Sequence, residues 1–148
     1  MWNPEPLTQR ITGNRTWLAR RGLQYGHERE YARCKACLEE TWRTSVSRLA
    51  EAILVALSQT GASPEASPAV DFAQDPMAAF GVREARRYRL RGGTPNLFLG
   101  LMSYCELGYL DLAAEADPRR DAECEYETFI HGCFERVEFG FCEEWLSE

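Results

Sequence analysis

The segment from Asp75 to Leu112 constrains the fold most, because it contains two helical patterns of different character joined by a glycine-marked turn. Asp75-Pro76 is typical of a helix N-cap followed by the first turn, and Gly92-Gly93 ends that helix. Thr94-Pro95 begins the second helix in the same way. The first helix is rich in arginine, whereas the second is apolar almost all round. We expect the second helix to be central to the fold, or to have its second face covered by a partner.

Two further helices are predicted from apolar residues that recur at steps of three and four. One begins near Glu28 and carries on one face Tyr31, Cys34, Leu38, Trp42, Val46, Leu49, Ile53 and Leu57. The last begins near positions 119–121 and carries Tyr126, Phe129, Ile130, Cys133, Phe134, Val137 and Phe141. A short opening helix around Trp17 is expected to break near Gly22 and Gly26, and the proline-containing run at 61–68 predicts a loop.

The chain is predicted to be all-α, because no alternating strand pattern or hairpin signal competes with these helices. Four long helices and one or two short N-terminal ones predict globin-like or four-helix-bundle-like packing. The chain has 148 residues, of which 45% are hydrophobic and 27% charged. We therefore expect a single domain over positions 1–148 that folds alone.

Charge and hydropathy predict where the chain acts. The opening stretch MWNPEPLTQRITGNR has no apolar core of a signal peptide, and no window approaches the roughly 18 uninterrupted apolar residues of a membrane span. We therefore expect a cytoplasmic protein that does not enter the membrane and keeps its cysteines reduced. A net charge of -6 opposes binding to nucleic acid.

Glu84 is the most unusual residue of the arginine-rich helix. A helical wheel places it in the middle of the inward face, among Met77, Phe80, Gly81, Ala85 and Tyr88. Arg87 and Arg91 follow along the same edge, so an ion pair could compensate the cost of burying a lone charge. One interpretation is a structural pair that locks the helix against its neighbour. The other is a cavity in which these three residues hold the polar end of a small effector, with walls from Tyr88, Phe98, Met102 and Tyr104.

The other arginines of this helix, Arg83, Arg86 and Arg89, lie at different angles and are expected to form a solvated face. The alternative is that this row receives an acidic surface of a second copy.

Cysteine and histidine spacing offers a metal or haem alternative. Cys34 and Cys37 have chelating spacing within one helix, and His131 with Glu135, or Cys105, would have to complete a zinc or iron site. The second ligand pair usual for such sites is absent from the sequence, so we expect no metal and no other cofactor. His131 lies on the flank of its apolar stripe, which disfavours it as a haem ligand.

Three cysteines of the last helix are spaced by nine residues, so Cys124 and Cys142 share a face while Cys133 points into the core. We expect Cys133 to be inert. Cys124 and Cys142 would then be exposed thiols, which leaves redox sensing as an alternative function.

Enzymatic activity is not expected. The sequence contains neither Gly-x-Ser-x-Gly nor a phosphate-binding loop nor His-Glu-x-x-His. The phosphoacceptor helix and the ATP-binding glycine boxes of a histidine kinase are also absent from it.

A resemblance to a known family is carried by two segments, DPMAAFGVREARRYRLRGGTPNLFLGLMSYCELGYLDL from Asp75 to Leu112 and FERVEFGFCEEW from Phe134 to Trp145. They resemble the N-terminal sensory region of bacterial PAS-containing sensor histidine kinases. They are similar, more weakly, to the haem-free globin-like N-terminal domain of stressosome co-antagonist proteins. The resemblance implies a globin-like input domain whose last helix leads into downstream signalling domains of the same polypeptide.

We therefore predict a cytosolic sensory or regulatory input domain that forms a homodimer and transmits a change through its last helix. The amphipathic last helix could form a parallel pair with its symmetry mate. The alternative is a helical interaction scaffold that recruits a partner protein without a small-molecule effector. A haem or redox sensor is a further alternative.

Overall fold

The computed structural model describes residues 2–28, 35–61, 63–64, 74–116 and 119–147, and within these ranges the chain forms six α helices and no strand. The helices are α1 (Glu5–Gly13), α2 (Arg15–Glu28), α3 (Lys35–Ser58), α4 (Pro76–Leu90), α5 (Pro95–Ala116) and α6 (Arg120–Leu146). The all-α prediction is confirmed, with four long helices after two shorter N-terminal ones. A specifically globin-like packing is not confirmed.

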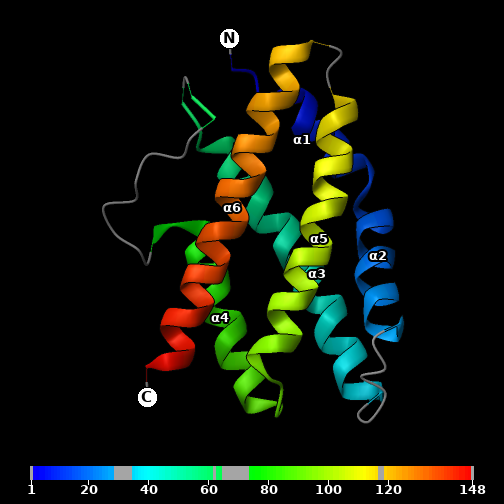
Figure 1. Cartoon of the computed structure of the whole chain (residues 1–148), viewed down its shortest axis with the longest axis vertical. Coiled ribbons are helices and arrows are strands. Elements are labelled where there is room, and N and C mark those ends of the chain that lie inside the picture. The colour runs from blue at the N-terminus through cyan, green and yellow to red at the C-terminus, as the bar shows by residue number, and fades with distance from the viewer. Residues whose placement is uncertain (1, 29–34, 62, 65–73, 117–118, 148) are drawn as a thin grey trace.

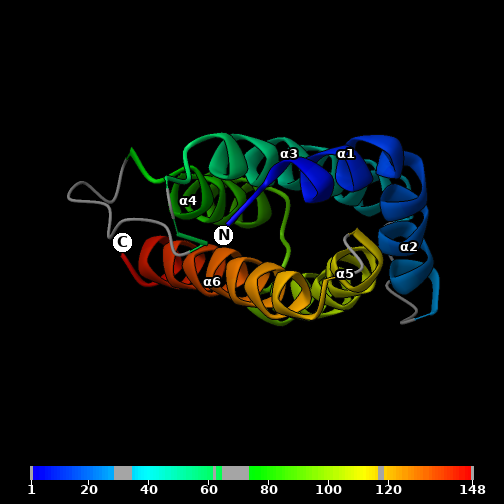
Figure 2. The ribbon, with the colours of Figure 1, turned by 90° about the horizontal axis from the view of Figure 1, so that it is seen from above.

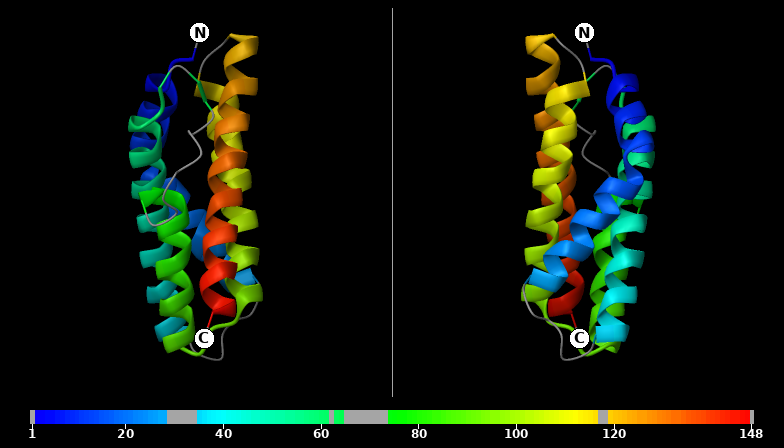
Figure 3. Two further views of the ribbon diagram at one scale, coloured as in Figure 1. Left: turned by 90° about the vertical axis from the view of Figure 1, so that its left-hand side faces the viewer. Right: turned by 90° about the vertical axis from the view of Figure 1, so that its right-hand side faces the viewer.

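The helices pack in two layers (Figures 1 and 2). One layer holds α1, α3 and α4, and the other holds α5 and α6. Helix α2 crosses one side of the molecule and contacts both α3 and α5, as the side views of Figure 3 show. On the opposite side, α4 and α6 make the most extensive contact of any helix pair. The core therefore lies between the layers and is closed by α2 at one side and by the α4–α6 contact at the other.

The helix boundaries around α4 follow the sequence signals. The Asp75 side chain accepts a hydrogen bond from the backbone N–H of Met77 at 3.0 Å, and Pro76 occupies the first turn. Gly92 has a φ of 71°, a left-handed conformation that favours glycine and ends the helix. Thr94 then accepts a hydrogen bond from the N–H of Leu97 at 3.4 Å at the start of α5. These predicted boundaries are confirmed because each depends on residues that are neighbours in the chain.

Glycines allow the backbones of α4 and α6 to touch. A Cβ atom on Gly81 would lie 2.2 Å from the carbonyl oxygen of Val137, and a Cβ atom on Gly140 would lie 2.3 Å from that of Ala78. Real Cβ atoms do not approach a carbonyl oxygen so closely, so no larger residue fits at either position without moving a helix. This reciprocal contact holds α4 against α6.

The predicted helix break near Gly22 and Gly26 is wrong, because α2 continues through both glycines to Glu28. A Cβ atom on Gly26 would lie 1.4 Å from the indole ring of Trp42, and one on Gly22 would lie 2.5 Å from Val46. Glycine within a helix costs about 1 kcal/mol relative to alanine. Burial of the Trp42 and Val46 side chains in the space that the glycines leave offsets this cost.

Helix α5 is the central helix that its composition predicted, and this chain itself covers most of its second face. One side of α5 packs on α6, while α1 and α2 lie against another. Leu99 and Leu110 are half-buried against the core, and only Leu107 among its large apolar side chains is strongly exposed, at 56%. Of the described helices, α5 is also long and apolar enough to cross a membrane by length and composition. Its place in the bundle accounts for that composition.

Part of the predicted pattern lies outside the described residues. On the predicted apolar face of α3, the side chains of Tyr31, Cys34 and Leu38 lie outside the described residues. The other five residues of that face are buried as predicted, namely Trp42, Val46, Leu49, Ile53 and Leu57. All seven residues of the predicted α6 stripe are buried. Helix α3 ends at Ser58, and positions 61, 63 and 64 of the predicted loop are not helical.

Candidate functional site

A buried polar cluster lies between α3 and α4 and consists of Ser45, Glu84, Arg87 and Tyr88. Glu84 is 1% exposed, and Arg87 Nη1 lies 2.5 Å from its Oε2. The same Arg87 nitrogen lies 3.5 Å from Ser45 Oγ, at the limit of a hydrogen bond. The inward position of Glu84 and its pairing with Arg87 are confirmed.

Two polar atoms of this cluster have no hydrogen-bond partner among the described residues, namely Glu84 Oε1 and the Tyr88 hydroxyl. Burial raises the pKa of Tyr88 above its ordinary value, and the Glu84 charge adds to this rise. Two groups oppose this rise of the pKa, the Ser45 hydroxyl and the Arg87 charge. The Ser45 hydroxyl lies close to that of Tyr88 but outside hydrogen-bond geometry. Tyr88 is therefore a neutral hydrogen-bond donor at physiological pH. The cluster combines one donor and one acceptor that the packing does not satisfy.

Arg91 does not join this cluster, contrary to the prediction. It is the C-cap residue of α4, with an exposed side chain. The wheel places it on the same edge as Glu84 and Arg87, but at this point the helix ends and none of the described helices covers it. Helical periodicity specifies the angle of a residue around its helix and not its burial at the helix end.

The predicted walls of a cavity are packed against one another. Phe98 is fully buried and stacks on Phe141, with ring centres 4.2 Å apart and an interplanar angle of 4°. The Tyr88 ring meets Phe98 edge-on at 5.2 Å, and Met102 is fully buried one turn further along α5. Tyr88, Phe98 and Met102 thus all belong to the packed hydrophobic core.

Tyr104 lies elsewhere, on the side of α5 that faces α2. Its ring packs against that of Tyr25 at 5.1 Å, and the Arg21 guanidinium lies 4.9 Å from its centre. The predicted set of seven ligand-binding residues is therefore divided. Five belong to the interior around α4, Arg91 is exposed, and Tyr104 packs under α2.

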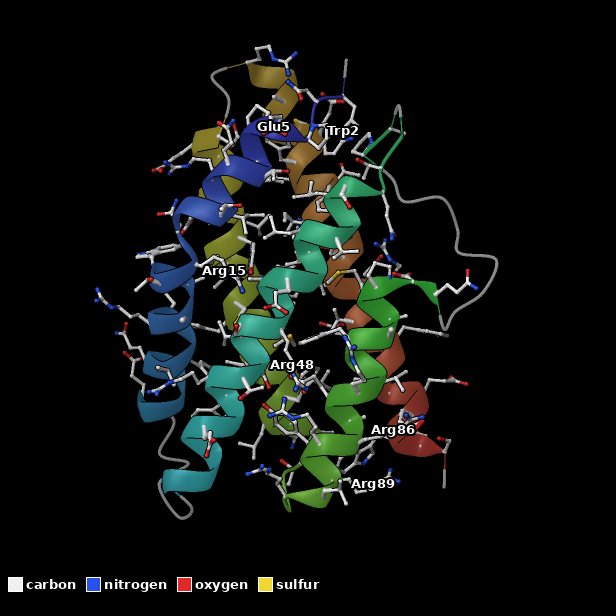
Figure 4. All side chains as sticks on the ribbon, turned by 180° about the vertical axis from the view of Figure 1, so that it is seen from behind. Trp2, Glu5, Arg15, Arg48, Arg86 and Arg89 are labelled. Atoms are coloured by element: carbon white, nitrogen blue, oxygen red, sulfur yellow. The ribbon has the colours of Figure 1, made fainter. Side chains whose placement is uncertain are left out.

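The outer arginines of α4 hold the end of α6 in a group that we call the C-terminal clamp, formed by Arg86, Arg89, Glu144 and Trp145. Arg86 Nε lies 2.6 Å from Glu144 Oε1 and lowers the pKa of that carboxyl group by hydrogen bonding. Arg89 donates to the Trp145 carbonyl oxygen, and its guanidinium lies 5.0 Å from the Trp145 ring. Figure 4 shows both arginines at the end of α4 beside the end of α6.

Arg83, Arg86 and Arg89 are exposed, as predicted for a solvated face, but Arg86 and Arg89 also bind the end of α6. Of this row, Arg86 pairs with a carboxylate, which belongs to α6 of the same chain, and the alternative of an acidic surface from a second copy stays a prediction. Helical periodicity relates residues of one helix only. It therefore could not predict that Arg86 and Arg89 contact residues 58 and 56 positions further along the chain.

No protein-family model, curated protein or solved structure matches this chain.

The metal and haem alternatives gain no support from the described residues. His131 is an exposed residue of α6, and its Nδ1 lies 2.7 Å from Glu106 Oε2 on α5. Within the part of the chain that the structure describes, no group of three or more histidine, cysteine, aspartate or glutamate side chains could hold a metal ion. The Cys34 and Cys37 side chains lie outside the described residues.

Thiol reactivity can be predicted for four cysteines. Burial raises the pKa of the Cys105 and Cys133 thiols to about 12, whereas Cys124 is exposed and Cys142 half-buried. The reactive species is the thiolate, so we expect maleimide to label Cys124 in the native protein at pH 8 and to leave Cys105 and Cys133 unmodified even at pH 9. Peptide mass mapping of the labelled chain measures this. Rapid labelling of Cys133 in the native state would contradict the packing of α6.

Proposed function

We propose that this chain is a non-enzymatic sensory or regulatory input domain that transmits a change through its last helix. As the resemblance implies, it would act in a bacterial signal-transduction protein such as a sensor histidine kinase, joined to downstream signalling domains. It would act in the cytosol and as a homodimer. One observation carries this proposal. Helix α4 bears the buried polar cluster on its inward face and holds the end of α6 through the C-terminal clamp on its outward face.

A link between these two faces is mechanically direct, because Gly81 on α4 and Gly140 on α6 leave no space between the two backbones. A shift of α4 that satisfied Glu84 Oε1 or the Tyr88 hydroxyl would therefore move α6 with it. Packed interiors transmit such shifts because they are bistable rather than continuously deformable. The proposed signal is a small polar molecule, or a partner's side chain, that changes the bonding of the polar cluster.

An interaction scaffold is the second candidate, and the aromatic packing favours it. Phe98, Phe141 and Tyr88 fill the interior beside the polar cluster. A domain with so little interior space would respond to a partner protein rather than to a small effector.

Native mass spectrometry of the freshly purified protein distinguishes the two candidates. We expect a dimer that carries extra mass, lost on denaturation, if an effector is retained. A dimer of unmodified chains would favour the scaffold and leave signalling through the dimer in place. A monomer would contradict the proposed output through paired last helices.

The C-terminal clamp gives a second test that does not depend on a ligand. We expect Arg89→Ala to increase hydrogen exchange of the backbone amides of the last α6 turn about fivefold, since it removes a cation–π contact and a hydrogen bond. Arg91→Ala, which removes an exposed arginine two positions further along the chain, is the matched control and should change nothing. Once the observed rates are divided by the intrinsic, base-catalysed exchange rate at each pH, opening of this turn should also increase as the pH falls through the lowered pKa of Glu144, because protonation removes its pairing with Arg86. Equal exchange in both variants would show that the clamp does not hold α6.

A further inference from the structure

An open groove runs between α3 and α4 on the outer face of the layer that they share. It has a volume of about 520 Å³ and is lined by residues that include Arg48, Ala52 and Val55 of α3 and Ala79 and Arg83 of α4. The alanines explain the groove, since larger side chains at these two lining positions would fill the space between the helices. Figure 4 shows Arg48 on α3 beside α4.

The charge of this groove is unbalanced. Arg48 and Arg83 are exposed, and neither forms an ion pair or hydrogen bond with any other described residue. Glu51 also lines the groove, but it pairs with Arg15 of α2 at 3.5 Å. The chain has a net charge of -6, yet this groove carries two guanidinium groups from different helices that have no partner among the described residues. The groove is therefore complementary to an anionic ligand.

The groove also has an apolar part. Val55 is 45% exposed, and the side chains of Ala52, Pro76 and Ala79 complete this surface. Ion pairs formed by exposed arginines contribute little free energy because water screens them, so a small inorganic anion would be held weakly. A ligand that also covers the apolar surface gains further free energy from its burial. An amphipathic segment with carboxylates beside apolar side chains satisfies both requirements.

We propose that the α3–α4 groove is a docking site for an acidic amphipathic helix of a partner protein. Carboxylates of that helix pair with Arg48 and Arg83, and its apolar side chains cover Val55 and the alanines. Arginine suits this role because its planar guanidinium can bind a carboxylate through two parallel hydrogen bonds. This proposal goes beyond the input function above and does not depend on an internal effector.

The test is fluorescence anisotropy with the full chain at low ionic strength. The probes are labelled helical peptides of about 16 residues that carry glutamate at i and i+4 beside leucine, and matched peptides with glutamine in place of glutamate. We expect only the acidic peptides to bind. We expect the double variant Arg48→Glu/Arg83→Glu to weaken this binding at least tenfold, because attraction becomes repulsion. Circular dichroism should show that the variant unfolds at the same temperature, since both arginines are exposed.

A second double variant, Arg20→Glu/Arg91→Glu, is the control for net charge, because it makes the same charge change at exposed positions outside the groove. It should retain binding within about twofold. Equal loss in the two double variants, or failure of every acidic peptide to bind more tightly than its glutamine counterpart, would overturn the proposal. Displacement of the peptide by millimolar inorganic phosphate would identify a small-anion site instead. Conversion of a dimer to a monomer by Arg48→Glu/Arg83→Glu would assign the groove to a second copy of this chain.

Discussion

Replacement of Gly81 by alanine is expected to destabilise the protein by about 2–3 kcal/mol, which lowers the melting temperature by roughly 5–10 °C for a domain of this size. The new Cβ atom would lie 2.2 Å from the Val137 carbonyl oxygen and 2.8 Å from the Phe141 nitrogen, so α4 and α6 would have to separate. Backbone atoms cannot rotate away as a flexible side chain can. The higher helix propensity of alanine offsets only about 1 kcal/mol of this cost.

Gly140→Ala should have a similar effect, because its Cβ atom would lie 2.3 Å from the Ala78 carbonyl oxygen. The control is Gly132→Ala on the same helix, where the nearest atom is Arg136 Nη1 at 3.5 Å. This change should leave stability unaltered or raise it by up to about 1 kcal/mol. Thermal unfolding followed by circular dichroism measures all three variants. If Gly81→Ala and Gly132→Ala unfolded at the same temperature, the close contact of α4 with α6 would be wrong.

Replacement of Arg87 by methionine is expected to cost about 3 kcal/mol, the second large effect. Methionine keeps much of the aliphatic stem but leaves the Glu84 carboxylate, which is 1% exposed, without its countercharge. Removal of one partner from a buried pair typically costs 3–5 kcal/mol, and we take the lower end because the Arg87 side chain is 20% exposed. Glu84→Gln should also be destabilising, by about 2 kcal/mol, since it removes the charge that compensates Arg87. Urea unfolding measures both variants.

The double variant Glu84→Met/Arg87→Met is the control for this pair. Replacement of both partners by apolar side chains of similar size leaves no unpaired charge, so its stability should return to within about 1 kcal/mol of the parent. Additive losses in the double variant would mean that the two side chains do not interact. If the double variant were fully stable but native mass spectrometry showed a changed oligomeric state or a changed mass of bound ligand, the pair would be kept for function rather than for folding.

The local features of the fold could be predicted from the sequence. The two ends of α4 are set by Asp75, Pro76 and Gly92, through interactions with residues one to four positions away. The inward position of Glu84 follows from helical periodicity, and its partner Arg87 is only three positions along the chain. Such features depend on backbone conformation and spacing within one helix, which are properties of the local sequence.

The tertiary structure alone decided how the helices meet. Gly22 and Gly26, which locally favour a break, lie inside α2 because Trp42 and Val46 of α3 occupy the space above them. The second face of α5, which could equally be covered by another copy, is covered largely by α1 and α2. Arg86 and Arg89 meet the end of α6 across more than fifty positions. Each outcome depends on which surfaces pack together, and many helix pairings bury similar apolar area, so periodicity within one helix does not determine it.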